Sequence, residues 1–190
     1  MREHIENVRM TVNAEFDTLE VPEKRKTDFM EVCIMPRMNK GGKFIFGKSE
    51  IHPDGIVQFP AQAVEEYHIA EEGKVYLFTG SRITGGFCVS RKGLLYPSKL
   101  GHILNDMPQL LDYTSAPGEF LRYKGRSYCW TDISKTGQIV LTKEMMEFLD
   151  ILPGMQLLSI RSSDIAFTMG AKGPLLEKAE NFEGEIQVFY

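Results

Sequence analysis

Two clusters of basic side chains in this sequence could contact phosphate groups. The first lies between Val32 and Ser49, a stretch without acidic residues, and the second lies close to Tyr123. The clusters comprise Arg37, Lys40, Lys43 and Lys48, and then Arg122, Lys124 and Arg126. Such cations bind a nucleic-acid backbone by neutralising phosphates and releasing counterions. Alternatively, the same side chains lie on solvated strand edges, where lysine discourages pairing with another sheet.

The sequence has no motif that is typical of an enzyme or of a metal site. No Gly-x-Ser-x-Gly turn, phosphate-binding P-loop or paired-carboxylate motif occurs. The histidines are scattered, without the spacing of metal ligands: His4, His52, His68 and His102. The cysteines stand far apart in apolar settings, which is typical of small buried side chains: Cys33, Cys88 and Cys129. We therefore expect no catalytic activity, no cofactor and no bound metal.

The composition is that of a globular protein with a substantial core. Of the 190 residues, 43% are apolar and 25% are charged. No apolar run reaches the roughly 18–20 residues that span a bilayer, and the N-terminus lacks the apolar core of a signal peptide. We therefore expect a cytoplasmic protein without membrane association. The net charge of −4 disfavours nucleic-acid binding by the whole surface but permits a local basic face.

An internal repeat relates residues 49–69 to residues 131–151 at a constant offset of 82. The identical pairs are Ile51 and Ile133, Gly55 and Gly137, Glu65 and Glu147, and Ile69 and Ile151. Small insertions then shift the match, so that Gly73 corresponds to Gly154. One such unit is too small to bury both faces of its sheet. We therefore expect the two units to pair around a pseudo-two-fold axis within the chain.

The two basic clusters occupy equivalent places in this repeat, because Lys40 and Arg122 are also 82 residues apart. A pseudo-two-fold axis would therefore place the clusters symmetrically. A protein that reads a palindromic DNA site requires such an arrangement.

Each copy has the pattern of two short strands, a helix and two further strands. In the second copy, a strand at Tyr128–Ile133 is followed by a turn at Gly137, which supplies a positive φ. Thr142 is expected to cap the next helix. Leu152–Met155 has proline and glycine at the central positions of a type II turn. The fold class expected from this pattern is α+β, mainly β.

Two matching strings carry a resemblance to a known family. They are GIVQFPAQAVEEYHIAEEGKVYL in the first copy and GQIVLTKEMMEFLDILPGMQL in the second. Both resemble the AbrB/MazE/SpoVT family, over roughly residues 44–95 and 126–176. The resemblance implies two ββαββ repeats that form one pseudo-two-fold barrel of the swapped-hairpin, cradle-loop type. It also implies a tandem, MraZ-like fusion and a role in sequence-specific DNA binding.

The sequence departs from the DNA-binding members at two places in each copy. Those members commonly have arginine after the turn glycine, where this chain has Ile56 and Gln138. They also carry a basic pair in the preceding strand, where this chain has Ser49-Glu50 and Thr131-Asp132. Acidic groups there would repel phosphate. We expect these side chains to be exposed, so that the change leaves the fold unaffected.

These observations lead to two main hypotheses for function, with an enzyme as a third and weaker one that a deep pocket lined by polar groups would favour. The first is a DNA-binding transcriptional regulator that contacts double-stranded DNA through the seven basic residues named above. The second is a non-catalytic barrel that binds a protein partner or a small ligand and has lost DNA binding. Both a monomer and a homo-oligomer are compatible with the sequence.

The repeat divides the chain into five segments. Residues 1–40 form an N-terminal extension, residues 41–98 the first repeat, and residues 122–176 the second. Between the repeats, residues 99–121 are expected to form a linking helix, interrupted near Pro108, and a loop. Residues 177–190 form a C-terminal tail whose alternating pattern is compatible with a last strand.

Overall fold

The structure, a computed structural model, describes residues 44–190. The first copy forms β1 (Ile45–Glu50), β2 (Ile56–Gln58), α1 (Ala61–Glu66), β3 (Lys74–Thr79) and β4 (Phe87–Ser90). The second forms β6 (Arg126–Asp132), β7 (Gln138–Val140), α5 (Lys143–Leu149), β8 (Gln156–Ser163) and β9 (Ala166–Gly170). Between the copies lie α2 (Lys92–Leu95), α3 (His102–Asp106), α4 (Pro108–Leu111) and β5 (Leu121–Tyr123). The chain ends with α6 (Pro174–Glu180) and β10 (Val188–Phe189).

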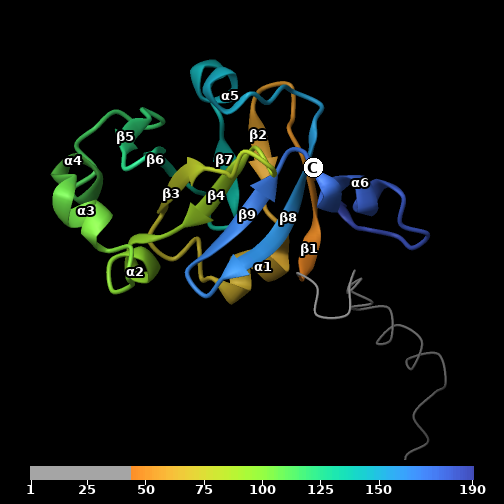
Figure 1. Cartoon of the computed structure of the whole chain (residues 1–190), viewed down its shortest axis with the longest axis horizontal. Coiled ribbons are helices and arrows are strands. Elements are labelled where there is room, and N and C mark those ends of the chain that lie inside the picture. The colour runs from red at the N-terminus through yellow and green to blue at the C-terminus, as the bar shows by residue number, and fades with distance from the viewer. Residues whose placement is uncertain (1–43) are drawn as a thin grey trace, which may run out of the picture. The chain divides into compact units, whose positions relative to one another are not determined.

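The two copies exchange strands (Figure 1). One mixed sheet has the order β10-β1-β8-β9-β4-β3-β6-β5, and β2 pairs with β7 in a second sheet. The first strand of each copy pairs with the third strand of the other, β1 with β8 and β6 with β3. Cys88 of β4 lies opposite Thr168 of β9, and Val57 of β2 lies opposite Ile139 of β7. The exchange therefore follows a two-fold relation whose axis passes near these two pairs.

Backbone hydrogen bonds between the copies follow the same relation. The N–H of Phe59 donates to Gly137 O at 3.0 Å, and that of Leu141 donates to Gly55 O at 2.9 Å. The N–H of Ile51 donates to Met155 O at 3.0 Å, and that of Ile133 donates to Gly73 O at 3.1 Å. Gly73 is therefore equivalent to Met155, and the sequence match of Gly73 to Gly154 was wrong by one residue.

The prediction of a closed barrel was wrong. The eight-stranded sheet is open, and β2 and β7 form a separate pair that does not join its ends. The reason lies in two short strands outside the part of the repeat that the two copies share. β10 pairs in parallel with β1 at Lys48 and Ser49, and β5 pairs with β6. The outer edges of β1 and β6, which a closed barrel would have to join to other strands, are therefore already paired.

The largest core cluster lies between the inner face of the sheet, the β2–β7 pair and the helices α1 and α5. Its aromatic members are Phe46, Phe59, Tyr67, Phe87 and Phe167, each at most 2% exposed. The side chains of strand β3 are buried on both faces of the sheet. Val75 and Leu77 point into this cluster, whereas Tyr76 and Phe78 point into another. Alternate side chains of a strand point to opposite faces, so a run of apolar residues buries both.

Helices cover the outer face of the large sheet at both sides (Figure 1). The helices α2, α3 and α4 pack against β3 and β6 through Leu95, Leu104 and Leu110. On the other side, α6 packs its buried Ala179 against Leu158 and other residues of β1 and β8. The middle strands, β4 and β9, lie between these two covers.

Candidate nucleic-acid interface

The second basic cluster forms the β5–β6 hairpin at one end of the large sheet. Arg122 pairs with Ser127, and Tyr123 pairs with Arg126. Lys124 and Gly125 between them have φ angles of 44° and 86°. A two-residue loop with two positive φ angles matches the right-handed twist of its strands, and glycine favours it. The position of this turn could have been found from its Lys-Gly pair between two β-prone segments.

The three cations of the hairpin surround its tip and do not share one face. Arg122, Lys124 and Arg126 are all exposed. Residues that pair directly across two strands share a face, so Arg126 lies on the side of Tyr123 and Arg122 on the opposite side. Lys124 occupies the turn. A hairpin with cations on both faces and at its tip could reach phosphates on both sides of a DNA groove, because the major groove admits a two-stranded ribbon.

The hairpin keeps most of its positive charge. Within residues 44–190, Asp106 of α3 is the only carboxylate that forms an ion pair with the three cations, 4.0 Å from Lys124 Nζ. The Asp106 carboxylate also accepts a hydrogen bond from the Tyr123 hydroxyl. A hydrogen bond with Tyr123 raises the pKa of Lys124, which further favours the charged ammonium. Arg126 lies with its Cζ atom 6.0 Å from the centroid of the Phe78 ring.

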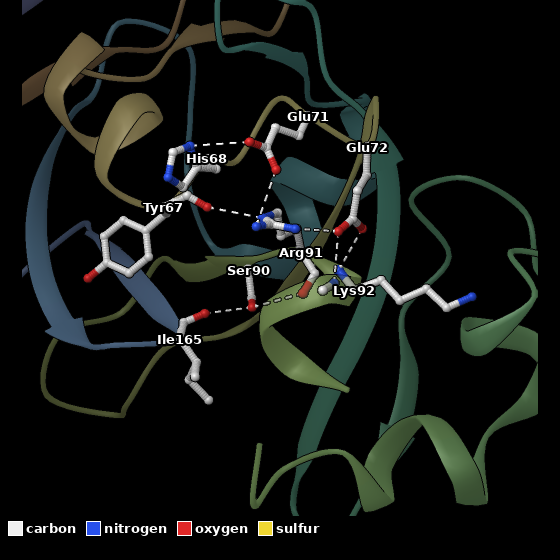
Figure 2. A network of polar contacts seen from close by, with 9 residues as sticks. Tyr67, His68, Glu71, Glu72, Ser90, Arg91, Lys92 and Ile165 are labelled. Atoms are coloured by element: carbon white, nitrogen blue, oxygen red, sulfur yellow. Dashed lines mark hydrogen bonds and ion pairs between the residues drawn. The ribbon is translucent and has the colours of Figure 1, made fainter. Parts of the chain in front are cut away.

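A polar network holds the helices that support this hairpin (Figure 2). The Glu72 carboxylate, which lies just before β3, accepts hydrogen bonds from the backbone N–H groups of Lys92 and Gly93 at 3.0 Å and 2.8 Å. Arg91 donates to the same carboxylate at 2.6 Å and to the carbonyl oxygen of Tyr67 at 3.1 Å. These bonds fix the beginning of α2, and α2 leads into the helix that carries Asp106. Sequence patterns gave no sign of this network, because its members are far apart in the chain.

Substitution of Glu72 by alanine should lower the free energy of unfolding by about 2 kcal/mol, since it leaves Nη1 of Arg91 and two backbone N–H groups without this acceptor. Urea unfolding followed by Trp130 fluorescence measures the change, because Trp130 is the chain's one tryptophan. The matched control is Glu71→Ala, whose carboxylate is 56% exposed and also lies near Arg91, at 3.3 Å. The control should lose less than about 1 kcal/mol. Equal losses would show that the network does not hold α2.

Lys48, the one member of the first cluster that the structure describes, does not lie at this hairpin. Lys48 is half-buried on β1, between Val188 of β10 and Leu158 of β8. It therefore lies toward the opposite end of the sheet, where the strand exchange places the first strand of the other copy. Arg37, Lys40 and Lys43 lie outside the described residues. The symmetric placement of the two clusters therefore stays a prediction.

The side chains at Ser49, Glu50, Thr131 and Asp132 were expected to be exposed, and that expectation was wrong for two of them. Ser49 is fully buried and Thr131 is 7% exposed. The Ser49 hydroxyl donates to the carbonyl oxygen of Gln58 at 2.6 Å, which satisfies it inside the protein. Glu50 is half-buried and Asp132 is exposed. The serine and threonine are therefore part of the core, and only the acids face the solvent.

The Cys129 thiol and clusters of metal-binding side chains are the other candidates for chemistry in residues 44–190. Burial raises the pKa of the Cys129 thiol to about 12, so it stays protonated and is a poor nucleophile. These residues contain no group of three or more His, Cys, Asp or Glu side chains that could hold a metal ion. None of their helices is both long and apolar enough to cross a membrane. Comparisons with protein-family models, with curated proteins and with solved structures found no significant match.

Proposed function

We propose that this protein is a DNA-binding regulatory protein that contacts the duplex through the β5–β6 hairpin. The observation that carries the proposal is the placement of three exposed cations around the tip of one hairpin, with one ion pair among the described residues. The backbone twist of a two-residue turn matches that of its strands, so the turn fixes where the backbone presents the three cations. Arg122, Lys124 and Arg126 would contact phosphates, and Arg122 or Arg126 could also reach base edges.

The protein's charge distribution is compatible with this role. The formal net charge is −4, so random surface contacts with DNA are unfavourable. Binding would depend on the local field of the hairpin, which is strongest close to its tip. The proposal includes the first cluster, Arg37, Lys40, Lys43 and Lys48, as a second set of phosphate contacts.

The salt dependence of binding to random duplex DNA tests the proposal, with fluorescence anisotropy as the readout. The wild type should bind at low salt, about 50 mM, with a steep negative slope of log affinity against log salt. The variant Arg122→Ala/Lys124→Ala/Arg126→Ala should lose about 0.9 from that slope for each phosphate contact removed, or about 2.7 for three. Its affinity at low salt should fall at least about tenfold.

The matched control is Lys135→Ala/Lys143→Ala/Lys178→Ala, which removes three exposed cations elsewhere and lowers the net charge equally. This control should keep the slope of the wild type. Equal weakening of both triple variants would show that only net charge matters. Absence of wild-type binding at low salt would overturn the proposal and favour a protein partner or a small ligand.

A further inference from the structure

A cavity of about 240 Å³ lies on the outer face of the large sheet, near the two-fold axis. Its floor contains Cys88 and Thr168, the residues that face each other across β4 and β9. The helices α2–α4 cover the sheet on one side of these strands, and α6 covers it on the other. The small side chains of the floor leave the space between the two covers open.

One wall of the cavity breaks the repeat. The connection between β3 and β4 spans residues 80–86 and carries Ser81 and Thr84, whereas the equivalent connection between β8 and β9 spans residues 164–165 and is shorter by five residues. Hydrogen bonds within the longer loop, and from the segment after β9, hold this loop in place. The hydroxyls of Ser81 and Thr84 lie 2.9 Å apart, and Thr84 O accepts from the N–H groups of Ala171 and Lys172 at 2.9 Å and 3.0 Å. This wall is therefore preformed, and only one copy of the repeat provides it.

The floor and walls combine hydroxyl groups with apolar surface. Thr168 Oγ1 lies 3.3 Å from Cys88 Sγ and also hydrogen bonds to the Ser162 hydroxyl. Hydroxyl groups can donate or accept a hydrogen bond, so the hydroxyls of Thr168 and Ser162 can offer a donor to a ligand. Phe78, Leu100 and Ile165 supply the apolar part of the lining. Ligand sites commonly pair such apolar walls with a few polar groups that fix orientation.

The lining of the cavity carries positive charge and no negative charge. Arg126 is the only charged residue among those that line the cavity, and no carboxylate lines it. Within residues 44–190, no Asp or Glu forms an ion pair with Arg126. A planar guanidinium binds a carboxylate through two parallel hydrogen bonds. The cavity therefore favours an anion with a planar head and an apolar body.

We propose that this cavity binds a small organic carboxylate. The carboxylate would lie against Arg126 and the hydroxyls of Thr168 and Ser162, with its body between Phe78 and Ile165. The volume is just below the range of about 300–1,000 Å³ that is typical of drug-sized ligands, so a metabolite of modest size fits. The site goes beyond DNA binding and does not depend on it, although both involve Arg126.

Titration with benzoate, followed by protein NMR, tests the proposal, and benzamide is the neutral probe of equal size. Benzoate should shift the amide resonances of Cys88 and Thr168 at millimolar concentration and bind at least about tenfold more tightly than benzamide, because a charge-assisted pair exceeds a neutral hydrogen bond. Equal binding of the two probes, or no shift at these residues, would overturn the proposal.

Two arginine variants separate this site from DNA binding. Arg126→Gln should weaken benzoate at least about tenfold and leave benzamide unchanged. Arg122→Gln makes the same charge change on the same hairpin, but Arg122 does not line the cavity. It should leave both probes unchanged while weakening DNA. Equal loss of benzoate binding in both variants would show a general charge effect and would contradict the site.

Filling the cavity provides a second test. Ser162→Leu places an apolar side chain in the lining at an exposed position, so folding should be retained. This variant should lose binding of both benzoate and benzamide, with unchanged Trp130 fluorescence. Undiminished benzoate binding in a folded Ser162→Leu protein would place the ligand elsewhere and overturn the proposal.

Discussion

Replacement of Phe167 by alanine should lower the free energy of unfolding by about 3–5 kcal/mol, because it opens a cavity at the centre of the core. Phe167 is fully buried on β9 of the second copy. Its ring centroid lies 5.2 Å from that of Phe59, 5.3 Å from that of Tyr67 and 6.4 Å from that of Phe46. All three partners belong to the first copy. The substitution would therefore weaken the packing that joins the two copies.

Urea denaturation followed by Trp130 fluorescence measures this loss. Trp130 lies in a different cluster, on the outer face, and is 6% exposed, so it reports global unfolding without contacting the mutated site. The control is Phe182→Ala, which removes the same side chain at a position that is 38% exposed. The control should lose less than about 1 kcal/mol. A Phe167→Ala protein that loses as little as the control would show that the two copies are not joined through this ring.

The sequence was most informative where the structure depends on local chemistry. The hydroxyl of Thr142 accepts a hydrogen bond from the N–H of Met145 at 3.3 Å, which confirms the expected helix cap. Gly154 has a φ of 81°, and Met155 N donates to Leu152 O at 3.1 Å, as expected for the type II turn. These features involve residues only a few positions apart. The fold class, α+β and mainly β, was also confirmed.

The parts that could not be predicted depend on contacts between distant residues. The alternating pattern of the C-terminal tail was compatible with a last strand, but it did not predict the pairing of β10 with β1, which determines that the sheet is open. Ser49 and Thr131 appear polar in the sequence, and only the packed structure shows that both are buried. In the basic cluster, sequence proximity brought Arg122 and Arg126 together. Their placement on opposite faces follows from the register of β5 and β6, which the sequence did not determine.

Substitution of Gly55 by alanine should destabilise the protein by about 3 kcal/mol or more, for two separate reasons. Gly55 has a φ of +83°, which costs an L-residue about 1–2 kcal/mol. A Cβ atom there would also lie 2.1 Å from the carbonyl oxygen of Leu141, which is backbone of the other copy and cannot rotate away. Relief of this contact must disturb the hydrogen bond from Leu141 N to Gly55 O. The β2–β7 pair, which that bond extends, would be weakened.

Two other glycines separate the two causes, because both have nearly the same φ. At Gly154, with a φ of +81°, an added Cβ would meet nothing within 4 Å, so alanine should cost only about 1–2 kcal/mol. At Gly137, the equivalent of Gly55, the Cβ would lie 2.3 Å from Cγ2 of Val64, a side chain that has some freedom to move. We expect losses of free energy in the order Gly55, Gly137, Gly154, measured by urea denaturation. Equal losses at all three would mean that φ alone sets the cost. The contact between Gly55 and Leu141 would then not hold the two copies in register.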